Sequence, residues 1–155
     1  MSLNWKQFHA GIVVPTLLEW PEVPHSLVED RLVSETLWHE SDQLTCLGQV
    51  PNDDDPDYFG PGLGICSMER DTWDDLVGRR GCPFRKRQYS ELIYDLRLNV
   101  IACRYRYFID LAPLPRLDDG IKARATYWWK VYNRGQVDRR ADYIRNAKAI
   151  PWEAA

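Results

Sequence analysis

The chain has 155 residues, of which 45% are apolar, 28% charged and 12% aromatic, enough to form one hydrophobic core. Nine glycines and ten prolines exclude a fibrous or low-complexity protein. No apolar run approaches the roughly 18 residues that a membrane-spanning helix needs. The N-terminal residues lack the apolar core of a signal peptide. We therefore expect one domain over residues 1–155, with no membrane span and no export signal.

The net charge of −3 is unevenly distributed. Residues 29–75 hold 2 basic and 13 acidic side chains, whereas residues 76–155 hold 17 basic and 8 acidic ones. This uneven charge has two interpretations: the basic second half attracts an anionic partner, or the acidic and basic segments form two solvated faces that attract each other. Nucleic-acid binding is not expected, because the whole chain is acidic and shows no helix-turn-helix or zinc-finger pattern.

Cysteine and histidine do not occur at metal-ligand spacing. The four cysteines, Cys46, Cys66, Cys82 and Cys103, include no C-x-x-C pair, and the three histidines are scattered. We expect reduced thiols, no metal site and no cofactor.

The first half of the chain predicts two helices and a long loop. Residues 4–20 indicate a short helix that Pro15 ends or kinks. Ser26 and Glu29 have the spacing of a capping box, which predicts a helix over residues 27–41. Residues 48–64 are rich in Gly, Pro and Asp and predict a loop.

Further helices are predicted over 69–77, 89–109, 117–132 and 137–147, because apolar residues recur at steps of three and four. No segment shows the sustained alternation of a strand. The expected class is mainly α, with little or no β-structure and a Gly/Pro/Asp-rich loop.

One acidic residue lies on the apolar side of the helix over 27–41. At roughly 100° per residue, Glu40 falls inside the apolar stripe and Glu35 falls off its edge, so Glu35 is expected to meet water. A carboxylate taken out of water either pairs with a cation or acquires a raised pKa. Glu40 is therefore either the partner of an arginine from the basic half or a candidate general acid. The stripe consists of Val28, Leu32, Val33 and Leu37.

Three motifs occur in an order that is similar to a known family. Glu40-Ser41 ends the apolar helix, a Gly60-to-Met68 segment follows, and Tyr132-Asn133-Arg134-Gly135 comes later. This order resembles the lysozyme-like soluble lytic transglycosylases, and most of all their short phage-encoded members, over about residues 27–135. The resemblance implies a lysozyme-like helical domain that cleaves peptidoglycan.

Residue by residue, the resemblance makes Glu40 the catalytic acid. It places the other residues that match the family motifs in the substrate cleft, and it implies that the hydroxyl of Tyr132 contacts the Glu40 carboxylate. Ser67 stands where the family has a glutamine, and Arg134 where it has a small residue. Trp128 is expected in the core, and Trp129 is a candidate wall for sugar binding. The candidate substrate-binding residues are Ser41, Gly64, Ser67, Met68, Trp129, Tyr132 and Asn133.

The implied reaction is cleavage of the β-1,4 bond between N-acetylmuramic acid and N-acetylglucosamine. In a lytic transglycosylase the single Glu40 protonates the bridging oxygen and then assists formation of a 1,6-anhydro ring. A second carboxylate facing Glu40 instead favours hydrolysis. The loop aspartates that offer one are Asp53, Asp54, Asp55 and Asp57.

The resemblance also implies a partner and a location. The partner is the peptidoglycan glycan strand, with other phage virion proteins as further candidates. Such a product is made in the host cytoplasm and reaches the periplasm and cell wall as an endolysin or within a virion. The alternative is a catalytically degenerate virion or tail protein on the same scaffold, which the substitutions at Ser67 and Arg134 favour.

Overall fold

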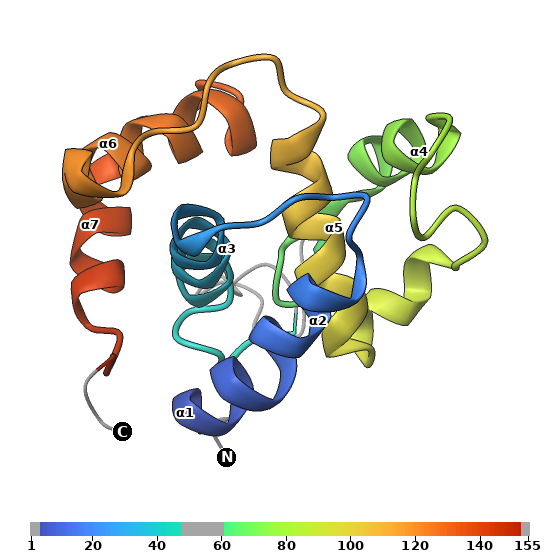
Figure 1. Cartoon of the computed structure of the whole chain (residues 1–155), viewed down its shortest axis with the longest axis horizontal. Coiled ribbons are helices and arrows are strands. Elements are labelled where there is room, and N and C mark those ends of the chain that lie inside the picture. The colour runs from blue at the N-terminus through green and yellow to red at the C-terminus, as the bar shows by residue number, and fades with distance from the viewer. Residues whose placement is uncertain (1–3, 48–60, 153–155) are drawn as a thin grey trace.

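A computed structural model of the chain describes residues 4–47 and 61–152. Over these two ranges the architecture is mainly helical, as the sequence predicts, and the strands are confined to one short hairpin. Figure 1 shows α3 (Leu27–Glu40) at the centre, with α6 (Gly120–Tyr127) and α7 (Arg140–Lys148) on one side and α5 (Leu96–Phe108) on the other. Within the described residues, no helix has the length and apolar character required to cross a membrane.

The central helix begins at the predicted capping box. The backbone N–H of Ser26 donates to the Glu29 carboxylate at 2.6 Å. From Leu32 to His39 every residue is buried, because neighbouring elements cover α3 on all sides. This part of the helix therefore has no solvent-facing stripe, and Glu40, directly after it, lines a pocket.

The N-terminal segment is more helical than expected. It comprises α1 (Trp5–Phe8), a π-turn η1 (His9–Val13) and α2 (Val14–Glu19). Pro15 does not end the helix. It lies in the first turn of α2, where a missing N–H is tolerated, directly after the wider π-turn.

The hairpin connects the central helix to the second half of the chain. Strands β1 (Gly62–Leu63) and β2 (Met68–Glu69) pair antiparallel, with Gly62 opposite Glu69 and Leu63 opposite Met68. Helix α4 (Arg70–Gly78) follows at once and confirms the helix predicted over 69–77. Most of the predicted loop, residues 48–60, lies outside the described residues.

The helix predicted over 89–109 is divided in two. A 3-10 turn η2 (Tyr89–Ile93) precedes α5, and the Asp95 carboxylate between them accepts from the Leu98 N–H at 2.9 Å. The apolar spacing runs through both parts, so periodicity alone misses this N-cap.

The helix predicted over 117–132 is also interrupted. It consists of η3 (Leu117–Asp119), α6 and a second π-turn, η4 (Trp128–Tyr132). The last helix, α7, starts three residues later than expected and packs against α3 and α6.

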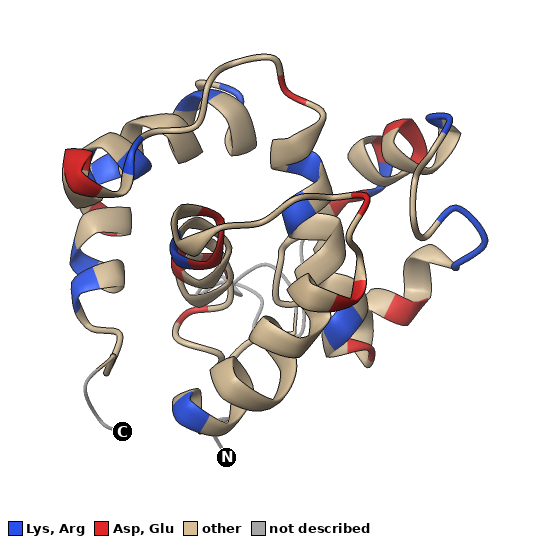
Figure 2. Cartoon of the chain, in the orientation of Figure 1, with Lys and Arg blue, Asp and Glu red and all other residues tan. Residues whose placement is uncertain are grey.

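Opposite charges from the two halves of the sequence meet in the structure. Figure 2 shows acidic and basic positions interspersed over the helices. Arg104 of α5 pairs with the buried Glu29 at 3.3 Å, and Arg124 of α6 pairs with the buried Glu35 at 2.8 Å. Attraction between the acidic and basic halves therefore contributes to the fold itself.

Candidate functional site

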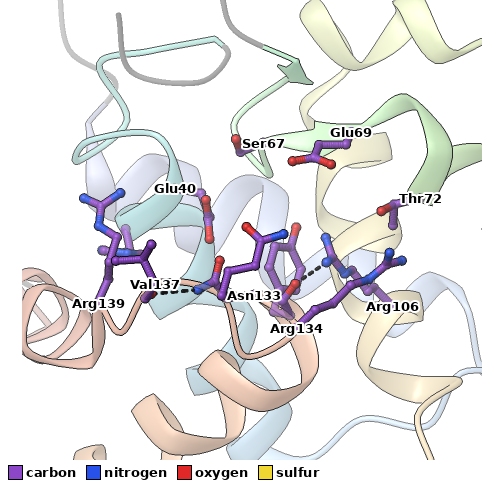
Figure 3. Close-up of a pocket in the computed structure, with 12 residues that line it drawn as sticks. Glu40, Ser67, Glu69, Thr72, Arg106, Asn133, Arg134, Val137 and Arg139 are labelled. Carbon is purple, nitrogen blue, oxygen red and sulfur yellow. Dashed lines mark hydrogen bonds between the residues drawn. The ribbon is translucent and has the colours of Figure 1, made fainter. Parts of the chain in front are cut away.

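Glu40 is the last residue of α3 and lines a pocket of about 280 Å³ (Figure 3). The indole Nε1–H of Trp128 donates to Glu40 Oε1 at 3.0 Å. Burial raises the pKa of the Glu40 carboxyl from 4.5 to about 7, against the opposing effects of the Trp128 hydrogen bond and the charges of Arg106 and Arg139. Glu40 is thus a carboxyl that holds its proton near neutral pH.

Glu40 has no ion-pair partner within the described residues. The guanidinium clamp that was the alternative expectation for Glu40 is found instead at Glu35. Arg124 of α6 donates to both oxygens of Glu35 at 2.8 Å, and the Tyr143 hydroxyl donates to Glu35 Oε2 at 3.1 Å. Glu35 is 1% exposed, so the expectation that it meets water is wrong. Its partners lie 89 and 108 residues further along the chain, a separation that helix periodicity does not detect.

His39 lies directly before the acid and is also buried. Asn146 Nδ2 donates to His39 Nδ1 at 2.8 Å, and the ring meets Trp128 edge-on, with 4.8 Å between centroids. Burial, reinforced by the charge of Arg139, lowers the pKa of His39 to about 4. A neutral imidazole therefore lies beside Glu40 near pH 7, and it supplies no cation that would depress the pKa of Glu40.

The turn of the hairpin forms the next wall. Gly64 has φ +73°, and a Cβ there would meet the Leu92 carbonyl at 2.7 Å and the Asn99 amide. The buried Asn99 Oδ1 accepts from the Cys66 N–H at 3.2 Å, which fixes the turn. Ser67 follows with φ 46° and lines the pocket. The backbone of the turn thus requires glycine at position 64. Ser67 is the residue of the turn whose side chain a ligand in the pocket can contact.

Tyr132 closes the opposite side. Its hydroxyl donates to the Cys66 carbonyl at 2.6 Å, so it joins η4 to the hairpin turn. The family resemblance implies a contact from this hydroxyl to the catalytic carboxylate, but the structure assigns that hydrogen bond to Trp128. Trp128 is the first residue of the π-turn and Tyr132 is its last, so this one turn carries both rings to the site.

The π-turn leads into a polar loop that completes the pocket. Asn133 Nδ2 donates to the Val137 carbonyl at 3.3 Å, and this bond is drawn in Figure 3. Arg134 has φ 53° and is exposed. Arg106 reaches the same pocket from α5 and stacks on Tyr132 with its guanidinium 4.0 Å from the ring centroid.

A second carboxylate lines the pocket. Glu69, the last residue of β2, is exposed, and in Figure 3 it lies across the pocket opening from Glu40. Its negative charge contributes to raising the pKa of Glu40. Thr72, from the first turn of α4, lines the same side. The aspartates at positions 53–57, considered for this role from the sequence, lie outside the described residues.

The structure brings together four of the residues predicted from the sequence and places the other four elsewhere. Glu40, Ser67, Tyr132 and Asn133 line the pocket. Ser41 is fully buried and bonds within its own turn, with its hydroxyl donating to the Leu37 carbonyl at 2.6 Å. Gly64 and Met68 shape the hairpin from beneath the pocket surface. Trp129 donates to the Gln136 carbonyl at 2.7 Å and does not line the pocket.

Sequence reasoning missed several pocket residues. The polar ones come from α3, the end of β2, α4, α5 and the loop before α7, so no common motif unites them. One of them has a signal in the sequence: Glu69 comes directly after the Gly60-to-Met68 segment, which the resemblance places in the cleft. The missed residues are His39, Glu69, Thr72, Arg106, Gln136, Val137 and Arg139.

No metal-binding group of three or more His, Cys, Asp or Glu side chains is found in the described ranges 4–47 and 61–152. Comparison with protein-family models, with curated proteins and with solved structures gives no match to this chain. The functional assignment therefore depends on the chemistry of the pocket and on the resemblance of its motifs.

Proposed function

We propose that this protein is a glycosidase that cleaves peptidoglycan, with Glu40 as its general acid. The observation that carries the proposal is a half-buried carboxyl at the end of a helix, open to a pocket and with a pKa near 7. A group with this pKa is largely protonated at pH 6 and can transfer its proton to a bridging oxygen. Three further features support a glycan substrate: a polar pocket, an adjacent carboxylate and the order of motifs noted in the sequence.

The proposed first step is proton transfer from Glu40 to the glycosidic oxygen between N-acetylmuramic acid and N-acetylglucosamine. As the bond breaks, positive charge develops on the sugar. The Glu40 carboxylate that results is stabilised by the Trp128 N–H and faces an environment with neighbouring cations. These contacts support the charged form of Glu40 once the proton has left.

The fate of the sugar distinguishes two reactions. In hydrolysis, Glu69 takes a proton from a water that attacks the sugar, and its position in the pocket favours this course. In transglycosylation, which the family resemblance implies, the ionised Glu40 takes the proton of the C6 hydroxyl and a 1,6-anhydro ring forms. We favour hydrolysis because a second carboxylate is present in the pocket.

The test uses purified cell-wall sacculi and mass spectrometry of the released fragments. The wild type is expected to release soluble fragments, and Glu40→Gln is expected to reduce release at least about 100-fold, the usual scale of general-acid catalysis. Glu22→Gln, at an exposed position outside the pocket, is the matched control and should retain full activity. Reducing ends indicate hydrolysis and anhydro ends indicate transglycosylation. Intact sacculi with the wild type, or equal release by Glu40→Gln, would refute the proposal.

A non-catalytic protein on the same scaffold is the competing function. Ser67 in the hairpin turn, shorter than the glutamine of the family, is the observation that favours it. Such a protein would bind sacculi in a pull-down without releasing fragments. Under the proposed function, binding and release occur together.

A further inference from the structure

Two of the three arginines that line the pocket lie on the side opposite Arg139. In Figure 3, Arg106 and Arg134 lie toward Thr72 and Glu69, whereas Arg139 lies on the side of Glu40. Arg139 pairs with Asp142 at 3.5 Å. Neither Arg106 nor Arg134 has an ion-pair partner within residues 4–47 and 61–152. The pocket therefore presents two guanidinium groups whose charges no described carboxylate neutralises by direct contact.

Arg106 is held in a fixed orientation. Its guanidinium stacks on the Tyr132 ring, and Nη2 donates to the Tyr132 carbonyl. A guanidinium has five N–H donors in a planar fork, so these contacts leave further donors for a ligand. Because Tyr132 is itself held by Cys66, the position of this cation is set by the wall of the pocket.

Arg134 occupies a backbone conformation that long side chains rarely adopt. Its φ of 53° lies in the left-handed region, where glycine is favoured, and the next residue, Gly135, also has a positive φ of 64°. Strained conformations of this kind persist only where the surrounding structure holds them, and they cluster at functional sites. Ser67, with φ 46°, lines the same pocket. Among the described residues, five that are not glycine have a positive φ; Ser67 and Arg134 line the pocket, and the other three follow the end of α3.

We propose that Arg106 and Arg134 form a subsite for a carboxylate on the substituent of the glycan strand. Two guanidinium groups in one pocket repel each other, and a planar carboxylate that accepts from both relieves this repulsion. The inference rests on the proposed function. It adds that the pocket selects glycans that carry acidic peptide stems over neutral glycans with the same β-1,4 linkage.

The test is binding, separate from cleavage. Glu40→Gln protein is titrated calorimetrically with a soluble disaccharide-peptide fragment of peptidoglycan, and with the same fragment after its carboxylates are converted to amides. The acidic form is expected to bind at least 10-fold more tightly. Arg134→Gln should remove most of this preference, and Arg134→Lys should keep part of it. Lys122→Gln, which removes one positive charge from an exposed position outside the pocket, should leave the preference unchanged.

Arg134→Gly separates the ligand contact from the backbone. It should raise the midpoint of thermal unfolding, because glycine adopts the left-handed conformation without strain, and it should lose the preference for the acidic fragment. Equal affinity for both fragments in the parent, no measurable binding of either, or an unchanged preference in Arg134→Gly would overturn the subsite. A clear preference in a protein that releases nothing from sacculi would leave the subsite standing and remove the proposed cleavage.

Discussion

The hydrogen bond from Trp128 to Glu40 gives the most specific prediction about the acid. Replacing Trp128 with phenylalanine removes the indole N–H that stabilises the Glu40 carboxylate at 3.0 Å. A hydrogen bond to a charged group contributes about 1.5 to 3 kcal/mol, and one pKa unit corresponds to about 1.4 kcal/mol. Pocket water replaces part of this bond, so the lower value applies. The pKa of Glu40 should therefore rise by about one, from about 7 toward 8.

The assay is the pH dependence of fragment release from sacculi. Loss of activity at high pH marks ionisation of the acid, so in Trp128→Phe this loss should move to higher pH by about one unit. Trp129→Phe is the matched control, since its indole donates to the Gln136 carbonyl and does not contact Glu40. Thermal unfolding checks that the smaller ring leaves the fold intact. An unmoved alkaline limb in folded Trp128→Phe, or an equal movement in Trp129→Phe, would refute the assigned contact.

Three further predictions concern stability. Because the pKa of Glu40 in the folded protein lies above its ordinary value, its contribution to the free energy of unfolding is retained below about pH 4.5 and is lost as pH rises through 7. In urea unfolding, Glu40→Gln should therefore be more stable than the wild type by up to roughly 3 kcal/mol at pH 8, and equally stable at pH 4. Gly64→Ala should lose more than about 2 kcal/mol, whereas Gly78→Ala, where a Cβ meets nothing within 4 Å, should lose none; equal effects would contradict the assigned turn. Arg124→Met should cost about 3 to 5 kcal/mol by leaving Glu35 buried and unpaired, and a second change, Glu35→Met, should recover part of it; a double variant no more stable than the single one would argue against the buried pair.

Local signals predicted the element that carries the acid. Ser26 and Glu29 specify the start of α3 through their own hydrogen bonds, and the spacing from there places Glu40 at its end. Both features depend on residues a few positions apart, so a single sequence contains them. The short helix after the hairpin motif was predicted for the same reason.

Contacts between distant segments were not predictable in this way. Helix periodicity predicted that Glu35 is exposed to solvent, because no residue near it in the sequence indicates its pairing with Arg124. The same limit applies to Trp128, which was expected in the core. It is buried there, yet its indole N–H donates to Glu40, which lies 88 positions earlier in the chain.

The pocket itself combines both kinds of information. Ser67 and Asn133 were identified from motifs, whereas Glu69 and Arg106 enter only when the hairpin and α5 pack against α3. Arg134 stands where the family has a small residue, and its positive φ is a backbone conformation that a long side chain rarely adopts.

The ionisation of Glu40 in the intact protein tests the central claim most directly. Titration of the glutamate side-chain carboxyl carbons by ¹³C NMR, with the Glu40 signal assigned by its loss in Glu40→Gln, reports the protonation of this one group. The structure predicts a midpoint near pH 7 for Glu40, because burial raises its pKa. A midpoint near the ordinary value of 4.5 would contradict the assignment of Glu40 as the acid.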